Sequence, residues 1–490
     1  MVQTLPEYLL HWAERTPDAI FVGEPDRGRT HPYGEVAARV GRLRAKLDRL
    51  GVRRGDLVAI LAENSCAWVV SYLGIMAHGA VAVPLNTRHL AGDLGPILDR
   101  CRPAAAIADR DYVDRISIPR RQVLTTTELG EAGPGAPSVD GSEARPTELG
   151  LVCFTSGTTG TARGVMIHHE AVVRSGATFA QLFQSGPDSR TAVVCPLFHN
   201  TGYIDGLAHM LLANGRVDVP RRFDPEGTAR ALLARAYSFL IGVPTMYGRM
   251  LPALSAAPPP GDLAADLAPW LAYGGAPMPG SLATRLAEVM PAARLVNVYG
   301  LSEATSITHY LPWRPGARDL AAAGVPVPGT RDRIAPDGEL QVDSPTVMAG
   351  YWQDDAATRA RFDGPWLRTG DVARRGADGL VRIVGRVDDL INRGGEKIAP
   401  VEVESVIGGH PDVIDVSVVG LPDRDLGQAV AAAVVVRPGA HVDADHLGRY
   451  LAGRIADYKR PTRIHILPTL PRNPNGKVLT EEVRRLLSQA

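Results

Sequence analysis

The stretch from Phe154 to Val165 reads FTSGTTGTARGV and holds three glycines, four threonines and one serine. It follows an apolar run of strand length, Leu149–Phe154, and precedes a second apolar run, Val165–Ile167, and a helix-like stretch from His169. The glycine-rich segment is therefore predicted to be a loop between two strands. Glycines let backbone N–H groups approach an anion closely, and hydroxyls add further donors. We interpret the loop as a phosphate cradle, with a surface turn as the alternative. Its spacing matches neither the Walker A nor the Rossmann pattern.

The bulk composition limits the class of protein. A chain of 490 residues is longer than one hydrophobic core usually supports, so two or more domains are expected. It is 45% hydrophobic and 22% charged, which is typical of soluble globular proteins. Lysine plus arginine and aspartate plus glutamate each number 53, so the formal net charge is zero. This balance argues against nucleic acid or an anionic membrane as the main partner.

The cysteines and the N-terminal region bear on the compartment. Cys66, Cys101, Cys153 and Cys195 are scattered without metal-ligand spacing, which is typical of buried thiols in a reducing compartment. The chain begins with an amphipathic helical pattern followed by a strand pattern, and no segment approaches the roughly 18 apolar residues of a membrane span. We expect a cytoplasmic protein without a membrane span, either a monomer or a homodimer.

Short apolar runs alternate with helical patterns along most of the chain. Leu57–Leu61, Ala80–Pro84, Thr191–Pro196, Phe239–Pro244 and Arg294–Gly300 are strand-like, and each ends in a turn or a polar cluster. This alternation predicts an α/β fold with parallel sheets flanked by helices. Ligands bind at the carboxyl ends of the strands in such sheets.

The last hundred residues have a different pattern. Asp415–Gly420 and Ala429–Val436 are strand-like, and a helical stretch begins at Thr480. These elements could form a small separate domain.

Several polar clusters follow predicted strands. Taken singly, His199 is more typical of a structural histidine, Asp371 of a turn residue, and Lys477 of a solvated surface charge. Together and in order, six motifs resemble the adenylate-forming superfamily of acyl- and aryl-CoA synthetases, luciferase and peptide-synthetase adenylation domains. Besides the glycine loop, the motifs are PLFHNTG (196–202), AYGGAP (272–277), VYGLSEAT (298–305), LRTGDVA (367–373), GRVDDLINRGGEKIAPVEVE (385–404) and PRNPNGKVLT (471–480).

The resemblance covers nearly the whole chain and implies a two-part architecture. Residues 1–387 would form a large AMP-binding portion of several α/β subdomains, with sheets flanked by helices and the ATP and acid sites. Residues 388–490 would form a small, mobile α+β domain that carries the catalytic lysine, Lys477.

The resemblance also implies a reaction in two halves. A carboxylate attacks the α-phosphate of ATP and gives an acyl-adenylate plus pyrophosphate; a thiol then displaces AMP and gives a thioester. The implied cofactors and substrates are ATP, Mg²⁺ and CoA, or the phosphopantetheine of a carrier protein. The first half needs cations and backbone donors around the phosphates, and the second needs a channel that shields the adenylate from water.

By the same resemblance, catalysis would rest on Lys477, His199, Glu303 and Thr155, and the last two would position Mg²⁺. Asp371 would accept the ribose hydroxyls, with Arg386 nearby. The full set implied for ATP and AMP is Thr155, Ser156, Gly157, Thr158, Thr159, Gly160, Arg163, Gly274, Gly275, Ala276, Tyr299, Gly300, Ser302, Glu303, Asp371, Arg386 and Lys477.

The acid would lie beyond the gate residue His199, and Asp388 would be the hinge of the mobile domain. The Gly394–Gly395 loop would line the pantetheine tunnel after rotation. Asp205 is a candidate for an amino group only if its side chain points inward, which we do not expect. The implied acid pocket comprises His199, Asn200, Tyr203, Ile204, Val243, Tyr273, Gly300 and Leu301.

Two departures from the family pattern stand out. The glycine loop usually ends Pro-Lys-Gly and here ends Ala162-Arg163-Gly164, which keeps the cation; the usual Thr-Glu pair is Ser302-Glu303, which keeps the hydroxyl. The expected activity is an ATP-dependent carboxylic acid:CoA ligase. The alternative is a stand-alone adenylation enzyme that loads an aryl, fatty or amino acid onto a carrier protein. A non-catalytic nucleotide-binding protein is disfavoured by intact Glu303, Asp371 and Lys477.

Overall fold

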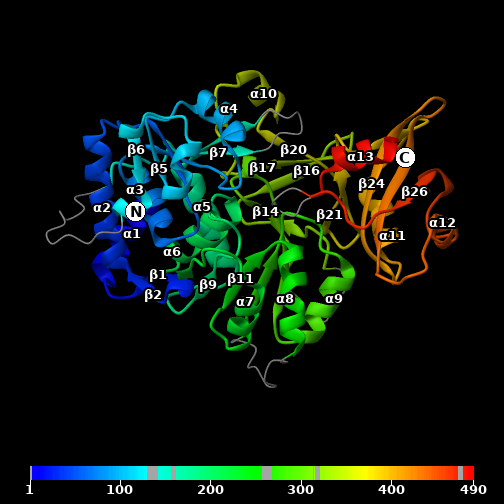
Figure 1. Ribbon diagram of the computed structural model, residues 1–490, viewed down its shortest axis with the longest axis horizontal. Coiled ribbons are helices and arrows are strands. Elements are labelled where there is room, and N and C mark those ends of the chain that lie inside the picture. Colours follow the sequence, from blue (N-terminus) through cyan, green and yellow to red (C-terminus); the bar gives the residue numbers. More distant parts are fainter. Residues whose placement is uncertain are drawn as a thin grey trace.

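The computed structural model describes residues 3–129, 142–155, 162–256, 268–312, 314, 320–472 and 478–489 (Figure 1). In these described ranges the strands form four sheets, two of them large. No helix in the same ranges is both long enough and apolar enough to cross a bilayer.

The first large sheet carries the strands around the glycine loop. Its strand order is β18-β8-β7-β4-β3-β5-β6. β7 runs parallel to β4 and antiparallel to β8, so the loop joins two neighbouring strands, as predicted. The bounds are β3 (Leu57–Leu61), β4 (Val81–Pro84), β5 (Ala105–Ala108), β6 (Val123–Thr125), β7 (Leu149–Thr155), β8 (Arg163–His168) and β18 (Gly350–Tyr351).

The second large sheet has the order β15-β14-β13-β12-β11-β9-β10-β1-β2. Its central strands β13, β12, β11, β9, β10 and β1 are parallel, so their carboxyl ends share one edge. The bounds are β1 (Ile20–Glu24), β2 (Arg29–Pro32), β9 (Arg190–Ala192), β10 (Arg216–Asp218), β11 (Phe239–Gly242), β12 (Trp270–Tyr273), β13 (Arg294–Gly300), β14 (Ile307–Tyr310) and β15 (Val325–Pro326).

Helices cover both large sheets, and one hydrophobic core contains residues of both. α3 is buried at every position except Ala67, and its Trp68 packs in the same core as Ile60 of β3 and Phe239 of β11. α7, α8 and α9 cover the opposite face of the second sheet with a core of their own, and α4 covers the opposite face of the first. The bounds are α1 (Leu5–Arg15), α2 (Tyr33–Arg49), α3 (Cys66–Ala77), α4 (Ala91–Cys101), α5 (His169–Leu182), α6 (His209–Leu212), α7 (Pro225–Leu233), α8 (Pro244–Ala256) and α9 (Gly280–Val289).

A smaller antiparallel sheet follows, in the order β16-β17-β20-β19 with β21 paired to β20. Its register places Asp371 of β20 opposite Arg386 of β21. The bounds are β16 (Arg331–Ile334), β17 (Glu339–Asp343), α10 (Asp355–Ala360), β19 (Phe362–Asp363), β20 (Trp366–Arg375) and β21 (Val381–Arg386).

The C-terminal part is a small α+β unit with its own hydrophobic cores, drawn in orange and red at one side of Figure 1. Its sheet has the order β23-β22-β25-β24, with β26 paired to β25. The predicted fold class is thus confirmed: a large α/β portion and a small C-terminal α+β unit. The bounds are β22 (Ile391–Arg393), β23 (Glu396–Ile398), α11 (Pro400–Gly408), β24 (Val413–Asp423), β25 (Gly427–Val436), α12 (Ala444–Leu451), β26 (Arg463–Ile466) and α13 (Thr480–Gln489).

Candidate active site

Four neighbouring parallel strands deliver most of the predicted site residues to one edge of the second sheet. The chain leaves β9 towards His199, β11 directly into Val243, β12 into the turn Gly274–Ala276, and β13 into Leu301–Glu303. Because β9, β11, β12 and β13 are adjacent and parallel, these segments lie side by side at their carboxyl ends. The structure therefore brings these predicted site residues to one edge of the sheet.

Tyr299, Asp371 and Arg386 form a cluster that joins this edge to the third sheet. The Tyr299 hydroxyl donates to Asp371 Oδ2 at 2.5 Å, and Arg386 Nη1 donates to Asp371 Oδ1 at 3.0 Å. Asp371 is 8% exposed, and its own N–H donates to Thr369 Oγ1 at 3.1 Å. The carboxylate is thus held in one orientation between a strand of the large sheet and a hairpin of the small one.

The electrostatics keep the Tyr299 phenol and the Arg386 guanidinium protonated. Burial and the neighbouring charge of Asp371 raise the pKa of Tyr299 well above its usual value, so the phenol remains a donor. Burial lowers the pKa of Arg386, but the charges of Asp371, Asp389 and Asp388 and the Tyr299 phenol together outweigh it, and the net shift is upward. A fixed carboxylate flanked by two donors is suited to accept hydrogen bonds from the hydroxyl groups of a sugar.

The Gly274–Ala276 turn is on the surface next to β13. A Cβ on Gly274 would lie 2.4 Å from the carbonyl oxygen of Val298, so only glycine allows the turn to approach β13 this closely. Gly275 has a φ of +74°, in the left-handed region that glycine favours. An exposed backbone turn beside Tyr299 can accommodate a planar ring.

Glu303 follows β13 and is tied to the base of the glycine loop. Its Oε1 accepts from the Tyr351 hydroxyl at 2.7 Å and lies 3.5 Å from Arg361 Nη2. Tyr351 is in β18, opposite Val165 of β8 in the sheet register. Burial and the charge of Glu303 raise the Tyr351 pKa, which keeps this phenol a donor as well.

The two ends of the glycine loop lie next to each other. Thr155 pairs with Arg163 across β7 and β8, and its Oγ1 lies 3.5 Å from the Arg163 carbonyl oxygen. The Arg163 guanidinium is 5.6 Å from the centre of the Tyr351 ring. Arg163 and Glu303 are therefore brought together through Tyr351. Five other predicted loop residues lie outside the described residues: Ser156, Gly157, Thr158, Thr159 and Gly160.

The residues present fit a magnesium ion bound chiefly through substrate phosphates. Among the described residues no group of three or more histidine, cysteine or acidic side chains could hold a metal by itself. Glu303 would supply a hard oxygen ligand, and its hydrogen bonds from described residues are made to Oε1. One or two protein oxygens plus phosphate oxygens are the usual set for Mg²⁺ at nucleotide sites.

The segment after β9 places His199 and Asn200 between the two large sheets. Asn200 Nδ2 donates to the Thr305 carbonyl at 2.9 Å, while its Oδ1 accepts from the Tyr203 hydroxyl and lies 3.8 Å from Cys153 Sγ. His199 is partly buried, with its ring 4.5 Å from that of Phe198. Asn200 thereby ties this segment to β7 and to the turn that follows Glu303.

Three residues predicted for the acid pocket are enclosed in hydrophobic cores. Tyr203, Ile204 and Tyr273 are each 0% exposed. The Tyr273 hydroxyl donates to the Leu320 carbonyl at 2.7 Å, on the face of the sheet that α8 and α9 cover. In this conformation these three side chains are packed in hydrophobic cores and have no exposed surface with which to contact an acid.

Sequence reasoning placed little weight on one residue that the structure brings into this region. Asp205 is 4% exposed, and its Oδ1 accepts from Ser306 Oγ at 2.5 Å. Burial raises its pKa to about 7. An acidic residue in an otherwise apolar segment, six positions after His199, was the available signal; its orientation could not be read from the sequence.

The predicted hinge and tunnel residues lie at the junction with the C-terminal unit. Asp388 is exposed in the turn between β21 and β22, directly after Val387, whose N–H donates to the Gly370 carbonyl at 2.9 Å. Gly394 and Gly395, with φ of +61° and +90°, form the turn between β22 and β23. Lys477 lies outside the described residues.

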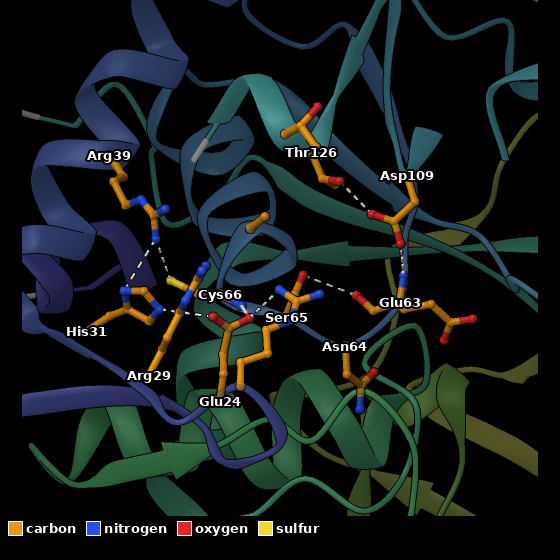
Figure 2. Close-up of a pocket in the computed structure, with 13 residues that line it drawn as sticks. Glu24, Arg29, His31, Arg39, Glu63, Asn64, Ser65, Cys66, Asp109 and Thr126 are labelled. Atoms are coloured by element: carbon orange, nitrogen blue, oxygen red, sulfur yellow. Dashed lines mark hydrogen bonds and ion pairs between the residues drawn. The ribbon is translucent and has the colours of Figure 1, made fainter. Parts of the chain in front are cut away.

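A polar cavity of about 280 Å³ lies apart from the predicted site residues, at the carboxyl ends of β1, β3, β5 and β6 (Figure 2). Figure 2 shows Arg39 directed at both His31 and Cys66, with Glu24 on the other side of His31. Asn64 lines this cavity and accepts the Leu197 N–H at 2.7 Å. The cavity thus borders the segment that carries His199, a relation that sequence analysis did not detect.

Comparison with known proteins agrees with this geometry. The family model described as AMP-binding enzyme matches residues 9–352, and that described as AMP-binding enzyme C-terminal domain matches residues 402–477. The chain is 32% identical to a feruloyl-CoA synthase of Amycolatopsis sp, over 99% of each chain. It is 29% identical to an indoleacetate–CoA ligase of Aromatoleum aromaticum, over 99% of this chain and 98% of the relative.

Among solved structures, ATP-bound MatB from Rhodopseudomonas palustris superposes with a TM-score of 0.89, at 27% identity and over 99% of each chain. The match extends through both the large portion and the C-terminal unit. The chain therefore belongs to the AMP-binding enzyme family and is an ATP-dependent acid–thiol ligase.

Proposed function

We propose that this ligase joins a ring-bearing carboxylic acid to CoA. The observation that carries the proposal is the Tyr299–Asp371–Arg386 cluster at the carboxyl ends of β9, β11, β12 and β13. It provides a rigid acceptor for the ribose next to the His199–Asn200 segment, which is proposed to bind the acid. The names of the feruloyl-CoA synthase and the indoleacetate–CoA ligase denote acids with aromatic rings, which supports a ring in the substrate.

In the first half-reaction, one carboxylate oxygen of the acid attacks the α-phosphorus of ATP. The bond from that phosphorus to the bridging oxygen breaks, and pyrophosphate leaves. Lys477 bridges the carboxylate and the α-phosphate, and Arg163 with the 155–164 loop holds the β- and γ-phosphates. Glu303 and Thr155 would hold Mg²⁺, which would supply neutralisation of the charge that develops on the phosphates.

The nucleoside is held by the cluster described above. Asp371 accepts the ribose hydroxyls while Arg386 and Tyr299 fix its orientation, and the adenine lies against the Gly274–Ala276 turn. His199 lies between this site and the acid and closes over the carboxylate. These contacts are made in both half-reactions, so they hold the adenylate between them.

In the second half-reaction, the thiol of CoA loses its proton and its sulfur attacks the carbonyl carbon of the adenylate. The carbon–oxygen bond to AMP breaks and the thioester forms. Residues 388–490 rotate about Asp388 between the halves, which withdraws Lys477 and brings Gly394–Gly395 to the pantetheine. The boundary after residue 387 is the short turn between β21 and β22.

A screen of pyrophosphate release tests the proposal. Fatty, aryl, dicarboxylic and amino acids are each supplied with ATP and Mg²⁺, alone, with CoA, or with a holo-carrier protein. We expect sustained turnover with at least one ring-bearing acid only when CoA is present. Turnover that needs the holo-carrier would favour the carrier-loading alternative, and no pyrophosphate with any acid would contradict ligase activity.

A further inference from the structure

The cavity of Figure 2 brings a nucleophilic sulfur, an imidazole and three arginine side chains together, apart from the predicted site residues. The sulfur belongs to Cys66, the first residue of α3. Arg39 Nη1 lies 3.2 Å from this sulfur and 3.4 Å from His31 Nδ1. The Cys66 N–H donates to Glu24 Oε1 at 3.2 Å, which fixes the first turn of the helix. The sulfur is thus held in one position beside a cation.

The end of the cavity that contains this sulfur is rich in positive charge. Its cations are Arg27, Arg29, Arg39 and His31. The hydrogen bond with Cys66 is the largest of the contacts that raise the pKa of His31 to about 10, so the imidazole is charged at neutral pH. The Arg29 guanidinium forms no hydrogen bond or ion pair with a described residue. Cations near a sulfur stabilise the negative charge that it carries as a nucleophile, and they attract anionic reagents.

The acidic side chains of the cavity are bonded within the protein. Glu24 Oε2 pairs with His31 at 3.1 Å. At the opposite end of the cavity in Figure 2, Asp109 accepts from the Thr126 hydroxyl at 2.5 Å and from the Glu63 N–H at 2.9 Å. The Glu63 carboxylate accepts from a tyrosine hydroxyl at the same end. The carboxylates at that end are therefore held away from the sulfur and its guanidinium neighbours.

The other three cysteines have different surroundings. Burial raises the pKa of Cys101 to about 12, that of Cys153 to about 11 and that of Cys195 to about 12. A thiol that stays protonated is a poor nucleophile. Among the described residues, Cys66 is the cysteine whose sulfur contacts a cation. A reagent that attacks thiolates should therefore select Cys66.

We propose that Cys66 is a site of reversible thiolation by small disulfides that carry carboxylates, which the arginines of the cavity bind. The Cys66 thiol loses its proton to solvent, its sulfur attacks one sulfur of the disulfide, and the other half leaves as a thiolate. A mixed disulfide forms without a further oxidant, and an external thiol reverses the reaction. The cavity volume of about 280 Å³ is several times the ~30 Å³ of one water, so half of a small disulfide fits beside the sulfur.

Asn64 connects this site to the segment that carries His199. It lies two positions before Cys66 and lines the same cavity. Its Oδ1 accepts the Leu197 N–H at 2.7 Å, and its Nδ2 donates to the Cys195 carbonyl at 3.3 Å. An adduct that displaces the start of α3 would change these bonds. We therefore expect thiolation of Cys66 to lower ligase activity.

A labelling experiment on the native, full-length protein tests the site. The anionic reagent is dithiobisnitrobenzoate and the neutral reagent is dithiodipyridine; released thiol is followed by absorbance, and the adduct is located by mass spectrometry of peptides. We expect about one rapid equivalent per chain with the anionic reagent, on Cys66. Cys66→Ser should lose this equivalent, and the matched control Cys101→Ser should keep it. A rapid equivalent that persists in Cys66→Ser, or none in wild type, would overturn the proposal.

The Arg29→Gln variant tests whether the cavity recognises carboxylates. Loss of this cation should slow the anionic reagent by at least about threefold and change the rate of the neutral reagent by less than about 1.5-fold. Arg359→Gln, which changes an exposed arginine of α10, should slow neither reagent. Equal slowing with both reagents would mean that Arg29 affects only access to the sulfur, and it would refute carboxylate recognition.

The consequence for activity is measured as CoA-dependent AMP formation with the best acid of the screen. Thiolated wild type should be at least about fivefold slower, and dithiothreitol should restore the rate. Cys66→Ser should stay within about twofold of untreated wild type and should not respond to the disulfide. An unchanged rate after complete thiolation would contradict the coupling through Asn64. The labelling result does not depend on ligase activity, so failure of this proposal and failure of the proposed function remain distinguishable.

Discussion

Asp371 is the residue whose surroundings support its proposed role, binding the ribose, most directly. Its two carboxylate oxygens are already bonded by a phenol and a guanidinium, so it presents a fixed, negatively charged acceptor at the site edge. Asp371→Ala should raise the KM for ATP by about 10- to 100-fold, since each charge-assisted hydrogen bond contributes about 1.5–3 kcal/mol. The ranking of acids should not change.

The matched control for this prediction is Asp363→Ala, in β19 of the same sheet. Asp363 is exposed, and among the described residues its carboxylate pairs only with Arg333, so its loss should leave the KM for ATP within about twofold. An unchanged KM in Asp371→Ala, or an equal rise in the two variants, would contradict the ribose role. The assay is initial velocity against ATP concentration at a saturating concentration of the acid.

At the residue scale, the sequence could show which residue types were present but not which atoms meet. Asp371 and Arg386 were both predicted, and the antiparallel register of β20 and β21 explains their contact. The bond from Tyr299 crosses 72 positions and two sheets, so no local pattern could indicate it. The inward orientation of Asp205 depends on a π-helical turn, whose side chains follow a different period from those of an α-helix.

At the scale of elements, the junction of β1, β2, α2 and α3 makes a pH-dependent contribution to stability. Cys66 and Glu24 face the imidazole of His31 and raise its pKa to about 10. Burial raises the pKa of Glu24, but the hydrogen bonds from His31 and the Cys66 N–H and the charges of Arg27 and His31 together outweigh it, and the net shift is downward. A histidine with a raised pKa stabilises the fold fully below its unfolded value and loses that contribution as the pH rises through 10.

His31→Gln should therefore lower the urea midpoint at pH 6 and much less at pH 10.5. The wild-type urea midpoint should decrease as the pH is raised from 6 to 10.5. The midpoint of His31→Gln should not show this decrease. The exposed His441 provides the control, because His441→Gln should change neither the midpoint nor the slope. A constant difference between His31→Gln and wild type across this range would refute the proposed titration.

Element positions were largely predictable where one pattern dominated. The run Leu57–Leu61 coincides with β3, and the glycine loop does join two strands. The run Thr191–Pro196 was wrong in extent, since β9 ends at Ala192. Asn64 bonds to the Val193 and Cys195 carbonyls and to the Leu197 N–H, which turns the apolar run away from the sheet. Such a tertiary contact leaves no trace in the local pattern.

At the scale of the whole molecule, the account requires the C-terminal unit to serve two half-reactions in turn. Its separate cores and the short exposed turn at Asp388 are suited to rotation as one body. Lys477→Ala should lower adenylate formation by at least about 100-fold, because it removes a cation from the developing charge. Thioester formation from supplied acyl-adenylate and CoA should stay within about threefold of wild type.

The two rates for Lys477→Ala are measured separately, as acid-dependent pyrophosphate release and as thioester formation from synthetic adenylate. Lys46→Ala, a change on α2 far from the C-terminal unit, should alter neither rate. Equal loss of both half-reactions in Lys477→Ala would contradict the rotation. The sequence could suggest this two-part architecture only through its resemblance to a family, because composition alone marks no boundary near residue 387.

The central claim, that the acid itself attacks the α-phosphate, is tested most directly by isotope transfer. The best acid of the screen is labelled with ¹⁸O in its carboxylate and incubated with the enzyme, ATP, Mg²⁺ and CoA. The mass of the nucleotide product is then measured by mass spectrometry. The account predicts AMP carrying one ¹⁸O atom from the acid, with pyrophosphate and thioester in equal amounts. Unlabelled AMP, or ADP with the label in inorganic phosphate, would contradict an acyl-adenylate intermediate.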